Sequence, residues 1–124
     1  MNAVKNNNCY ITQNGREVYQ FVVRVLPQML EQATARANIS INELDYIIVH
    51  QANKRILDYV IEKYKLDPEK VPLNIDKYGN MSSATVPVLL HELNAANKLK
   101  KGDLIALAGF GSGLAYGAAA VKWQ

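Results

Sequence analysis

The sequence predicts an α/β domain in which helices pack on the faces of a mainly parallel β-sheet. Three observations indicate this fold class. Compact apolar runs alternate along the chain with longer stretches whose apolar residues recur every three or four positions. This alternation gives the order β-α-β-α-β-α-β-β, which is typical of a parallel sheet with crossover helices. Only a short glycine-rich connection separates the last two strands, so that pair is expected to be antiparallel.

The first half of the chain contains two strand candidates and one long helix candidate. Residues 10–13 form a short strand-like run, and Asn14-Gly15 after it is typical of a turn. Apolar residues then recur at helical spacing over residues 17–38. We expect Pro27 to kink or split this helix because proline lacks the N–H group that the helical turn needs. Tyr46–Val49 is an apolar run that predicts a buried parallel strand.

The second half alternates in the same way between helical and strand-like patterns. The elements expected there are a helix over residues 53–64, a strand over 71–74, a helix capped by Ser82 or Ser83, and strands over 104–108 and 114–121. Apolar side chains share one face of each helix, so both helices are expected to pack on the sheet. Residues 109–113 are expected to form a loop between the last two strands.

Composition and charge exclude several classes of protein. The chain has 124 residues, of which 49% are hydrophobic and 20% are charged, as is typical of one globular domain. Its net charge of +3 comes without a basic stripe interleaved with aromatic residues, so nucleic-acid binding is not expected. Cys9 is the single cysteine, which rules out an internal disulfide and a cysteine-based metal site and fits a cytoplasmic protein.

Two segments bear on targeting and membrane insertion. Residues 1–8 are polar and asparagine-rich, so they are expected to be a flexible N-terminal segment and not a signal peptide. Residues 104–121 carry no charge but are interrupted by several glycines. A membrane-spanning helix needs about 20 apolar residues, so two buried strands joined by a tight loop are the better interpretation. No membrane contact is therefore expected.

Three polar or glycine-rich motifs follow predicted strands. They cover residues 50–53 (HQAN), 78–80 (YGN) and 109–113 (GFGSG). Ligands of open α/β sheets bind beyond the carboxyl ends of the strands, where these motifs can converge. Each motif also has a purely structural interpretation: His50 as a satisfied residue at a strand end, Asn80 as a turn residue after glycine, and the third motif as a tight turn. Their shared position favours a functional cleft.

The motifs resemble those of a known enzyme family. Residues 50–56 (HQANKRI), 78–84 (YGNMSSA) and 109–114 (GFGSGL) are similar in order and spacing to β-ketoacyl-acyl-carrier-protein synthase III, as are residues 14–18 and 118–123. This family initiates bacterial type II fatty-acid synthesis and has the thiolase-type fold. Its enzymes contain two similar βαβαβαββ halves. The chain resembles the C-terminal half, which implies a mixed, mostly parallel five-stranded sheet over residues 9–124.

The resemblance implies catalytic roles for His50 and Asn80. Decarboxylation of a malonyl thioester leaves an enolate with negative charge on the thioester oxygen. Preorganised donors aimed at such an oxygen lower the barrier, and loss of one typically costs about 10²–10³-fold in rate. A neutral imidazole Nε2–H and an amide NH₂ can both donate there. The resulting carbanion would attack an acyl group held on a cysteine, which in this family belongs to the N-terminal half.

Five further residues receive candidate roles from the same resemblance. The backbone N–H of Ser112 would contribute to a second oxyanion hole. Phe110 would form a wall of the pocket, with core packing as the equally good alternative. Asn53 would line the pantetheine channel. Arg55 and Lys54 would belong to a basic patch that docks the acidic carrier protein, with a solvated helix face as the alternative.

The implied partners are acyl carrier protein, acyl-CoA and malonyl thioesters, and the N-terminal half of the same enzyme, with no cofactor and no metal. We expect a homo-oligomer because the surface facing that half is apolar. Cys9 is not expected to be the nucleophile, so the chain alone is expected to be inactive. Two alternatives stay open: a type III polyketide synthase-like or secondary-metabolite condensing enzyme, and a non-catalytic carrier-protein binding module.

Overall fold

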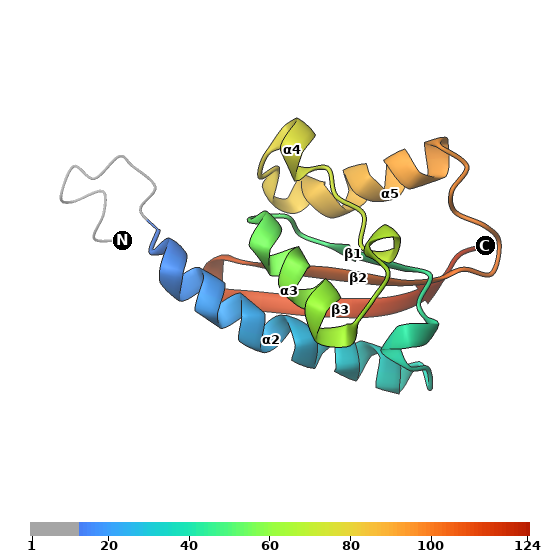
Figure 1. Ribbon diagram of the computed structural model, residues 1–124, viewed down its shortest axis with the longest axis horizontal. Coiled ribbons are helices and arrows are strands. Elements are labelled where there is room, and N and C mark those ends of the chain that lie inside the picture. Colours follow the sequence, from blue (N-terminus) through green and yellow to red (C-terminus); the bar gives the residue numbers. More distant parts are fainter. Residues whose placement is uncertain (1–12) are drawn as a thin grey trace.

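The computed structural model describes residues 13–124 and contains one three-stranded mixed sheet between two layers of helices (Figure 1). Strands β1 (Tyr46–Val49), β2 (Leu104–Gly111) and β3 (Ala115–Lys122) follow one another in that order across the sheet. The pair β1 and β2 is parallel, and the pair β2 and β3 is antiparallel. The expected antiparallel pairing of the last two strands is therefore confirmed.

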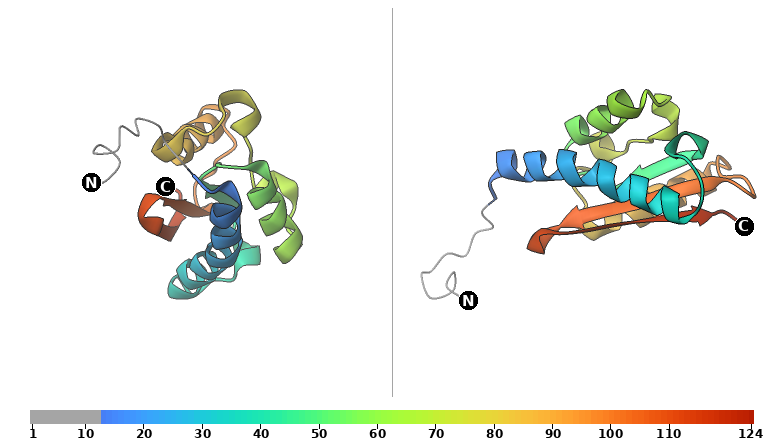
Figure 2. Two further views of the ribbon diagram at one scale, coloured as in Figure 1. Left: turned by 90° about the vertical axis from the view of Figure 1, so that its left-hand side faces the viewer. Right: turned by 90° about the horizontal axis from the view of Figure 1, so that it is seen from below.

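Helices cover both faces of this sheet. Helices α2 (Gly15–Arg36) and α3 (Lys54–Tyr64) pack against each other and cover one face. Helix α5 (Thr85–Ala95) covers the other face, with the short helix α4 (Ile75–Tyr78) beside it. Figures 1 and 2 show α5 and α2 on opposite sides of the strands. This is the layered α/β arrangement that the alternating pattern predicted.

Strand β1 explains why the core has two parts. Ile47 and Val49 pack into the apolar cluster under α2 and α3, whereas Ile48 packs into the cluster under α5. All three side chains are fully buried, because successive residues of a strand point to opposite faces and both faces are covered. The continuous apolar run that predicted a buried parallel strand is therefore confirmed.

Pro27 does not interrupt α2, so the expected break there is wrong. The helix runs without a break from Gly15 to Arg36, and Pro27 itself is buried. A proline inside a helix costs about 3 kcal/mol, whereas burying one Val or Leu side chain contributes about 1.5–3 kcal/mol. Val22, Leu26 and Leu30 are all fully buried around the proline. Packing on the sheet therefore outweighs the lost hydrogen bond.

Residues 71–74 do not form the predicted strand. Pro72 has no N–H to give to a sheet, and its carbonyl accepts a hydrogen bond from Gln51 Nε2 at 3.1 Å. The backbone N–H of Asn74 and that of Ile75 donate to Gln51 Oε1 at 3.0 and 2.9 Å. A side chain thus takes the place of a neighbouring strand as hydrogen-bond partner, and residues 13–124 form three of the four strands predicted within them. The predicted segment 1–8 and, apart from its last residue, strand 10–13 lie outside the described residues.

The boundaries of two other elements also differ from expectation. Strand β2 continues to Gly111, where Phe110 pairs with Tyr116, so the first part of the glycine-rich motif lies in the sheet and not in a loop. The expected cap of α5 by Ser82 or Ser83 is wrong, because residues Ser82–Ala84 form a separate 3₁₀ turn and no side chain caps the helix. No helix within residues 13–124 combines the length and the apolar character needed to cross a bilayer.

Candidate active site

His50 lies directly after β1 and is held from two sides. Its backbone N–H donates to the Ala108 carbonyl at 2.8 Å, which extends the β1–β2 ladder by one bond. Its ring contacts the ring of Phe110 edge-on, with 5.0 Å between the ring centroids. Burial lowers the pKa of His50, and a hydrogen bond with the Ser82 carbonyl opposes this shift. The imidazole is therefore biased toward its neutral form near pH 7.

Thr85, at the start of α5, contacts the His50 ring and was not identified from the sequence. Its side chain is fully buried. Its Oγ1 lies 3.3 Å from His50 Nδ1 and donates to the Ser82 carbonyl, with 3.0 Å between the two oxygens. The only signal in the sequence was a hydroxyl directly before an apolar run, which by itself is ordinary for a threonine near a helix end. The contact fixes the ring of His50 through Nδ1 and leaves Nε2 for other partners.

Asn80 is exposed in the loop between α4 and the 3₁₀ turn Ser82–Ala84. Its Oδ1 accepts a hydrogen bond from the backbone N–H of Ser82 at 2.9 Å. An N–H group requires an acceptor, so this contact assigns the amide oxygen to the Ser82 side. The amide NH₂ group of Asn80 is consequently turned away from its own loop and can donate to a ligand. Ser82 thereby connects Asn80, through Thr85, to His50.

The segment that leads into the Asn80 loop is anchored by two side chains. The fully buried Gln51 holds the backbone at the start of α4. Glu92 of α5 accepts hydrogen bonds from Asn74 Nδ2 at 2.8 Å, Tyr78 OH at 2.8 Å and Lys77 Nζ at 3.1 Å. These three donors lower the pKa of Glu92 to about 2. The position of Asn80 relative to the sheet therefore rests on side-chain hydrogen bonds.

The glycine-rich motif approaches the same place from β2. Phe110, which contacts His50, is followed after one residue by Ser112 in an exposed 3₁₀ turn. Gly113 in this turn has φ of +137°, and a Cβ there would lie 3.2 Å from the Cβ of Ala115. Only glycine tolerates that combination of backbone angle and crowding. The turn that displays the Ser112 backbone therefore depends on Gly113.

The remaining predicted residues lie at the beginning of α3. Asn53 caps this helix, and its Oδ1 accepts the backbone N–H of Arg55 at 3.0 Å. Lys54 forms an exposed ion pair with Asp58 at 2.7 Å, and Arg55 is also exposed. The structure thus places Phe110 against His50 and links Asn80 to His50 through Ser82 and Thr85, while Ser112 follows Phe110 after one residue. It places Asn53, Lys54 and Arg55 on the helix that starts just after His50.

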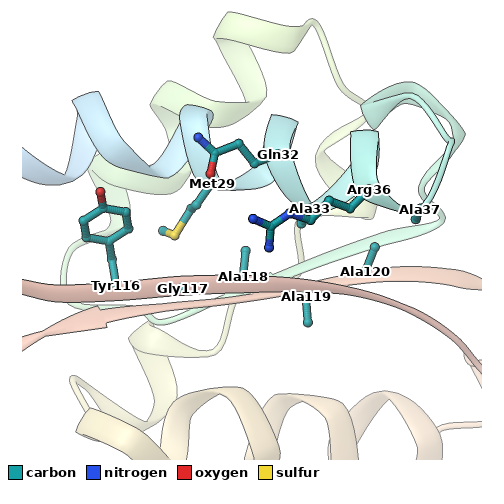
Figure 3. Close-up of a pocket in the computed structure, with 10 residues that line it drawn as sticks. All are labelled: Met29, Gln32, Ala33, Arg36, Ala37, Tyr116, Gly117, Ala118, Ala119 and Ala120. Carbon is teal, nitrogen blue, oxygen red and sulfur yellow. The ribbon is translucent and has the colours of Figure 1, made fainter.

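Two grooves in the described residues lie elsewhere. Figure 3 shows one of about 470 Å³ between α2 and β3, lined by Met29, Gln32, Ala33, Arg36, Ala37, Tyr116, Gly117, Ala118, Ala119 and Ala120. A second, of about 560 Å³, lies beside α3 and includes Lys54 and Leu73. Neither contains His50 or Asn80. Within residues 13–124 no group of three or more His, Cys, Asp or Glu side chains is arranged to hold a metal.

Comparisons with known proteins agree on one family. A sequence profile described as "3-Oxoacyl-[acyl-carrier-protein (ACP)] synthase III C terminal" matches residues 34–123. The β-ketoacyl-[acyl-carrier-protein] synthase III of Microcystis aeruginosa is 47% identical over 113 residues, which are 91% of this chain and 34% of that protein. The synthase III of Trichodesmium erythraeum is likewise 47% identical, over 92% of this chain and 35% of its own length. The chain therefore spans about a third of the length of the curated relatives it matches.

Solved structures agree on the same fold. A synthase III from Thermus thermophilus superimposes with a TM-score of 0.88 at 38% identity, covering 91% of this chain and 35% of its own. A variant of OleA from Xanthomonas campestris superimposes with a TM-score of 0.83 at 30% identity, covering 90% and 33%. The class of protein is thus an α/β domain with one half of the thiolase-type fold. The chain belongs to the family of 3-oxoacyl-[acyl-carrier-protein] synthase III C-terminal domains.

Proposed function

We propose that this chain is the C-terminal catalytic part of a synthase III that condenses acyl-CoA with malonyl-acyl carrier protein and so starts fatty-acid synthesis in the cytoplasm. His50 and Asn80 act together in this proposal as donors to one oxygen atom. One observation carries it: the connection from His50 through Thr85 and Ser82 to Asn80, which joins the two donor side chains in one hydrogen-bonded unit. Preorganisation of this kind is what oxyanion stabilisation requires.

The chemistry divides into two steps, decarboxylation and condensation. The malonyl thioester loses carbon dioxide, and the electron pair of the broken C–C bond becomes an enolate whose charge lies on the thioester oxygen. His50 and the NH₂ group of Asn80 donate to that oxygen. The enolate carbon then attacks an acyl thioester on the enzyme's cysteine, which leaves as a thiolate. The backbone N–H of Ser112 stabilises the oxygen of the attacked carbonyl, and Phe110 forms a wall beside it.

Carrier-protein docking is assigned to the first turn of α3. Lys54 and Arg55 are exposed there, within five residues of His50 in sequence. A carrier protein is acidic, and complementary charges speed and orient such encounters. The cap at Asn53 fixes the start of the helix, which sets how these cations are presented next to the site. Asn53 itself contacts the pantetheine arm through the part of its amide that does not cap the helix.

In this proposal the nucleophilic cysteine and the rest of the substrate tunnel belong to an N-terminal half of the enzyme. The 124 residues alone therefore do not condense substrates. Large apolar side chains stay exposed on the described residues; they are Leu73, Tyr78, Leu114, Tyr116 and Val121. Exposed apolar side chains of this kind are expected at interaction surfaces. We assign the part of this surface on and beside β3 to contact with the N-terminal half and, in its absence, to self-association into a homo-oligomer.

A chimera tests the proposed function. The matching third of the Microcystis aeruginosa synthase III is replaced by this chain, and condensation is measured with malonyl-carrier protein and with malonyl-CoA. We expect the chimera to condense malonyl-carrier protein. The Arg55→Glu variant should lose this activity, while its rate with malonyl-CoA should change little. A folded chimera that uses malonyl-CoA alone would instead support the polyketide-synthase-like alternative. One that binds the carrier protein without condensing would support the binding-module alternative.

A further inference from the structure

The side chain of Thr85 lies between two groups that compete for its single proton. Its Oγ1 is 3.0 Å from the Ser82 carbonyl oxygen and 3.3 Å from His50 Nδ1. A carbonyl oxygen can only accept, a hydroxyl can donate one proton, and an imidazole nitrogen does either, depending on the tautomer. The heavy-atom positions therefore constrain where the protons lie.

The first arrangement directs the Thr85 hydroxyl at His50 Nδ1. The Thr85 and Ser82 oxygens would then face each other at 3.0 Å with no proton between them. Thr85 is fully buried, so no solvent screens that repulsion. This arrangement is therefore unfavourable.

The second arrangement satisfies every contact. The hydroxyl donates to the Ser82 carbonyl over 3.0 Å, and His50 Nδ1–H donates to the lone pairs of Thr85 Oγ1. The Ser82 carbonyl has two lone pairs and also accepts the backbone N–H of Thr85. The Thr85 oxygen near Nδ1 is then matched by a ring N–H. The geometry consequently favours a proton on Nδ1.

We propose that Thr85 is a positioning residue that holds the neutral His50 ring as the Nδ1–H tautomer, with Nε2 as a bare lone pair. This replaces the simpler expectation of a neutral ring that donates from Nε2. Thr85 touches no substrate in this arrangement and acts only through His50. Its hydrogen bonds with Ser82 also couple the ring to the residue that orients the Asn80 amide.

The Nδ1–H tautomer changes how His50 donates during catalysis, a step that rests on the proposed function. A ring with its single proton on Nδ1 donates from Nε2 only after gaining a second proton. His50 then meets the enolate oxygen as an imidazolium, through a charge-assisted hydrogen bond that is about twice as strong as a neutral one. The partly buried, neutral ring takes up this proton from solvent as the negative charge develops, and releases it to the departing cysteine thiolate after the new C–C bond has formed. Oxyanion binding and protonation of His50 become one coupled event.

The test reads the tautomer directly in the ligand-free chain. Histidine-selective ¹⁵N labelling gives only two ring systems, His50 and His91, of which His91 is exposed and serves as an internal reference. Long-range ¹H–¹⁵N spectra are recorded at about pH 8.5, well above the ordinary histidine pKa of about 6.5. We expect His50 Nδ1 to show the shift of a protonated nitrogen and Nε2 that of an unprotonated one. A protonated Nε2 in the wild type would overturn the proposal.

Two variants separate tautomer control from simple packing. Thr85→Val keeps the shape but removes the acceptor at Nδ1, so we expect the His50 pattern to change toward Nε2–H while His91 does not change. Thr85→Ser retains the hydroxyl and is expected to keep the wild-type pattern. An unchanged Nδ1–H pattern in a folded Thr85→Val variant would contradict the role of Thr85. Because no substrate is present, these results stand apart from the activity of the chimera.

Discussion

Two regions of the molecule are built in opposite ways. The first is the end of β1 with the nearby loop, which carry His50 and Asn80, and the second is the outer strand β3. At the first, buried polar side chains with specific partners set the geometry: Gln51 and Thr85 are both fully buried and hydrogen-bonded. At the second, Tyr116 and Leu114, which directly precedes the strand, are 53% and 54% exposed, and the strand has no neighbour on its outer side within residues 13–124. The chain thus fixes the geometry around His50 by itself, whereas the apolar surface on and beside β3 stays exposed.

The largest effect is expected at Gln51. Gln51→Ala removes the partner of three backbone groups, namely the Pro72 carbonyl and the N–H groups of Asn74 and Ile75. An orphaned buried group costs about 1–3 kcal/mol, so we expect a loss of about 3 kcal/mol or more in the free energy of unfolding. Urea denaturation measures it. Gln32→Ala, at an exposed glutamine of α2, is the matched control and should change stability by less than about 0.5 kcal/mol. Equal effects of the two variants would contradict this view of the first region.

A smaller, pH-dependent effect is expected at Glu92. Its folded-state pKa of about 2 lies below its ordinary value, so its hydrogen bonds contribute stability above about pH 4.5. That contribution is lost as the pH falls through about 2. Glu92→Gln should therefore be less stable than the wild type at pH 7, and the difference should close as the solution is acidified. Thermal unfolding at several pH values between 7 and 2 measures this, and a difference that does not depend on pH would contradict the assigned role.

The smallest effect on stability is expected beside β3, at Leu114 in the turn that precedes the strand. Leu114→Ser removes an apolar side chain that is already exposed, so the free energy of unfolding should change by less than about 0.5 kcal/mol. Self-association of the chain should weaken in the same variant, because the surface loses apolar area. Sedimentation velocity at several concentrations measures the association. A stability loss above about 1 kcal/mol, or unchanged association, would show that β3 is not the open surface inferred here.

The two regions also differ in how well the sequence predicted them. Tyr46–Val49, α3 and the antiparallel pair β2 and β3 follow from periodic patterns, because local spacing decides which faces are buried. The position of His50 directly after its strand follows from the same reasoning, whereas Asn80 was expected after a strand over residues 71–74 and instead follows the short helix α4. These features required only the order of residues along the chain.

Other features depend on residues that are distant in sequence. Gln51 is followed by a helix, and nothing local indicates that its amide takes the place of a strand partner for residues 72–75. Residues 71–74 were therefore predicted as a strand although Pro72 lacks a donor. Thr85 was missed for the same reason, since its role depends on the ring of His50, which is 35 residues away. Pro27 was misjudged because its cost was weighed without the buried surface on both sides of it.

The pairing of His50 with Asn80 is tested most directly by the rate of malonyl-carrier-protein decarboxylation in the chimera. Asn80→Asp keeps the size of the side chain but replaces the NH₂ donor with a negative oxygen. We predict a decrease of about 10²–10³-fold, as for the loss of an oxyanion-hole donor. Asn94→Asp makes the same change at an exposed position of α5 and should leave the rate unchanged. A folded Asn80→Asp chimera that decarboxylates within a few-fold of the parent would contradict the assignment of Asn80 to the oxyanion hole.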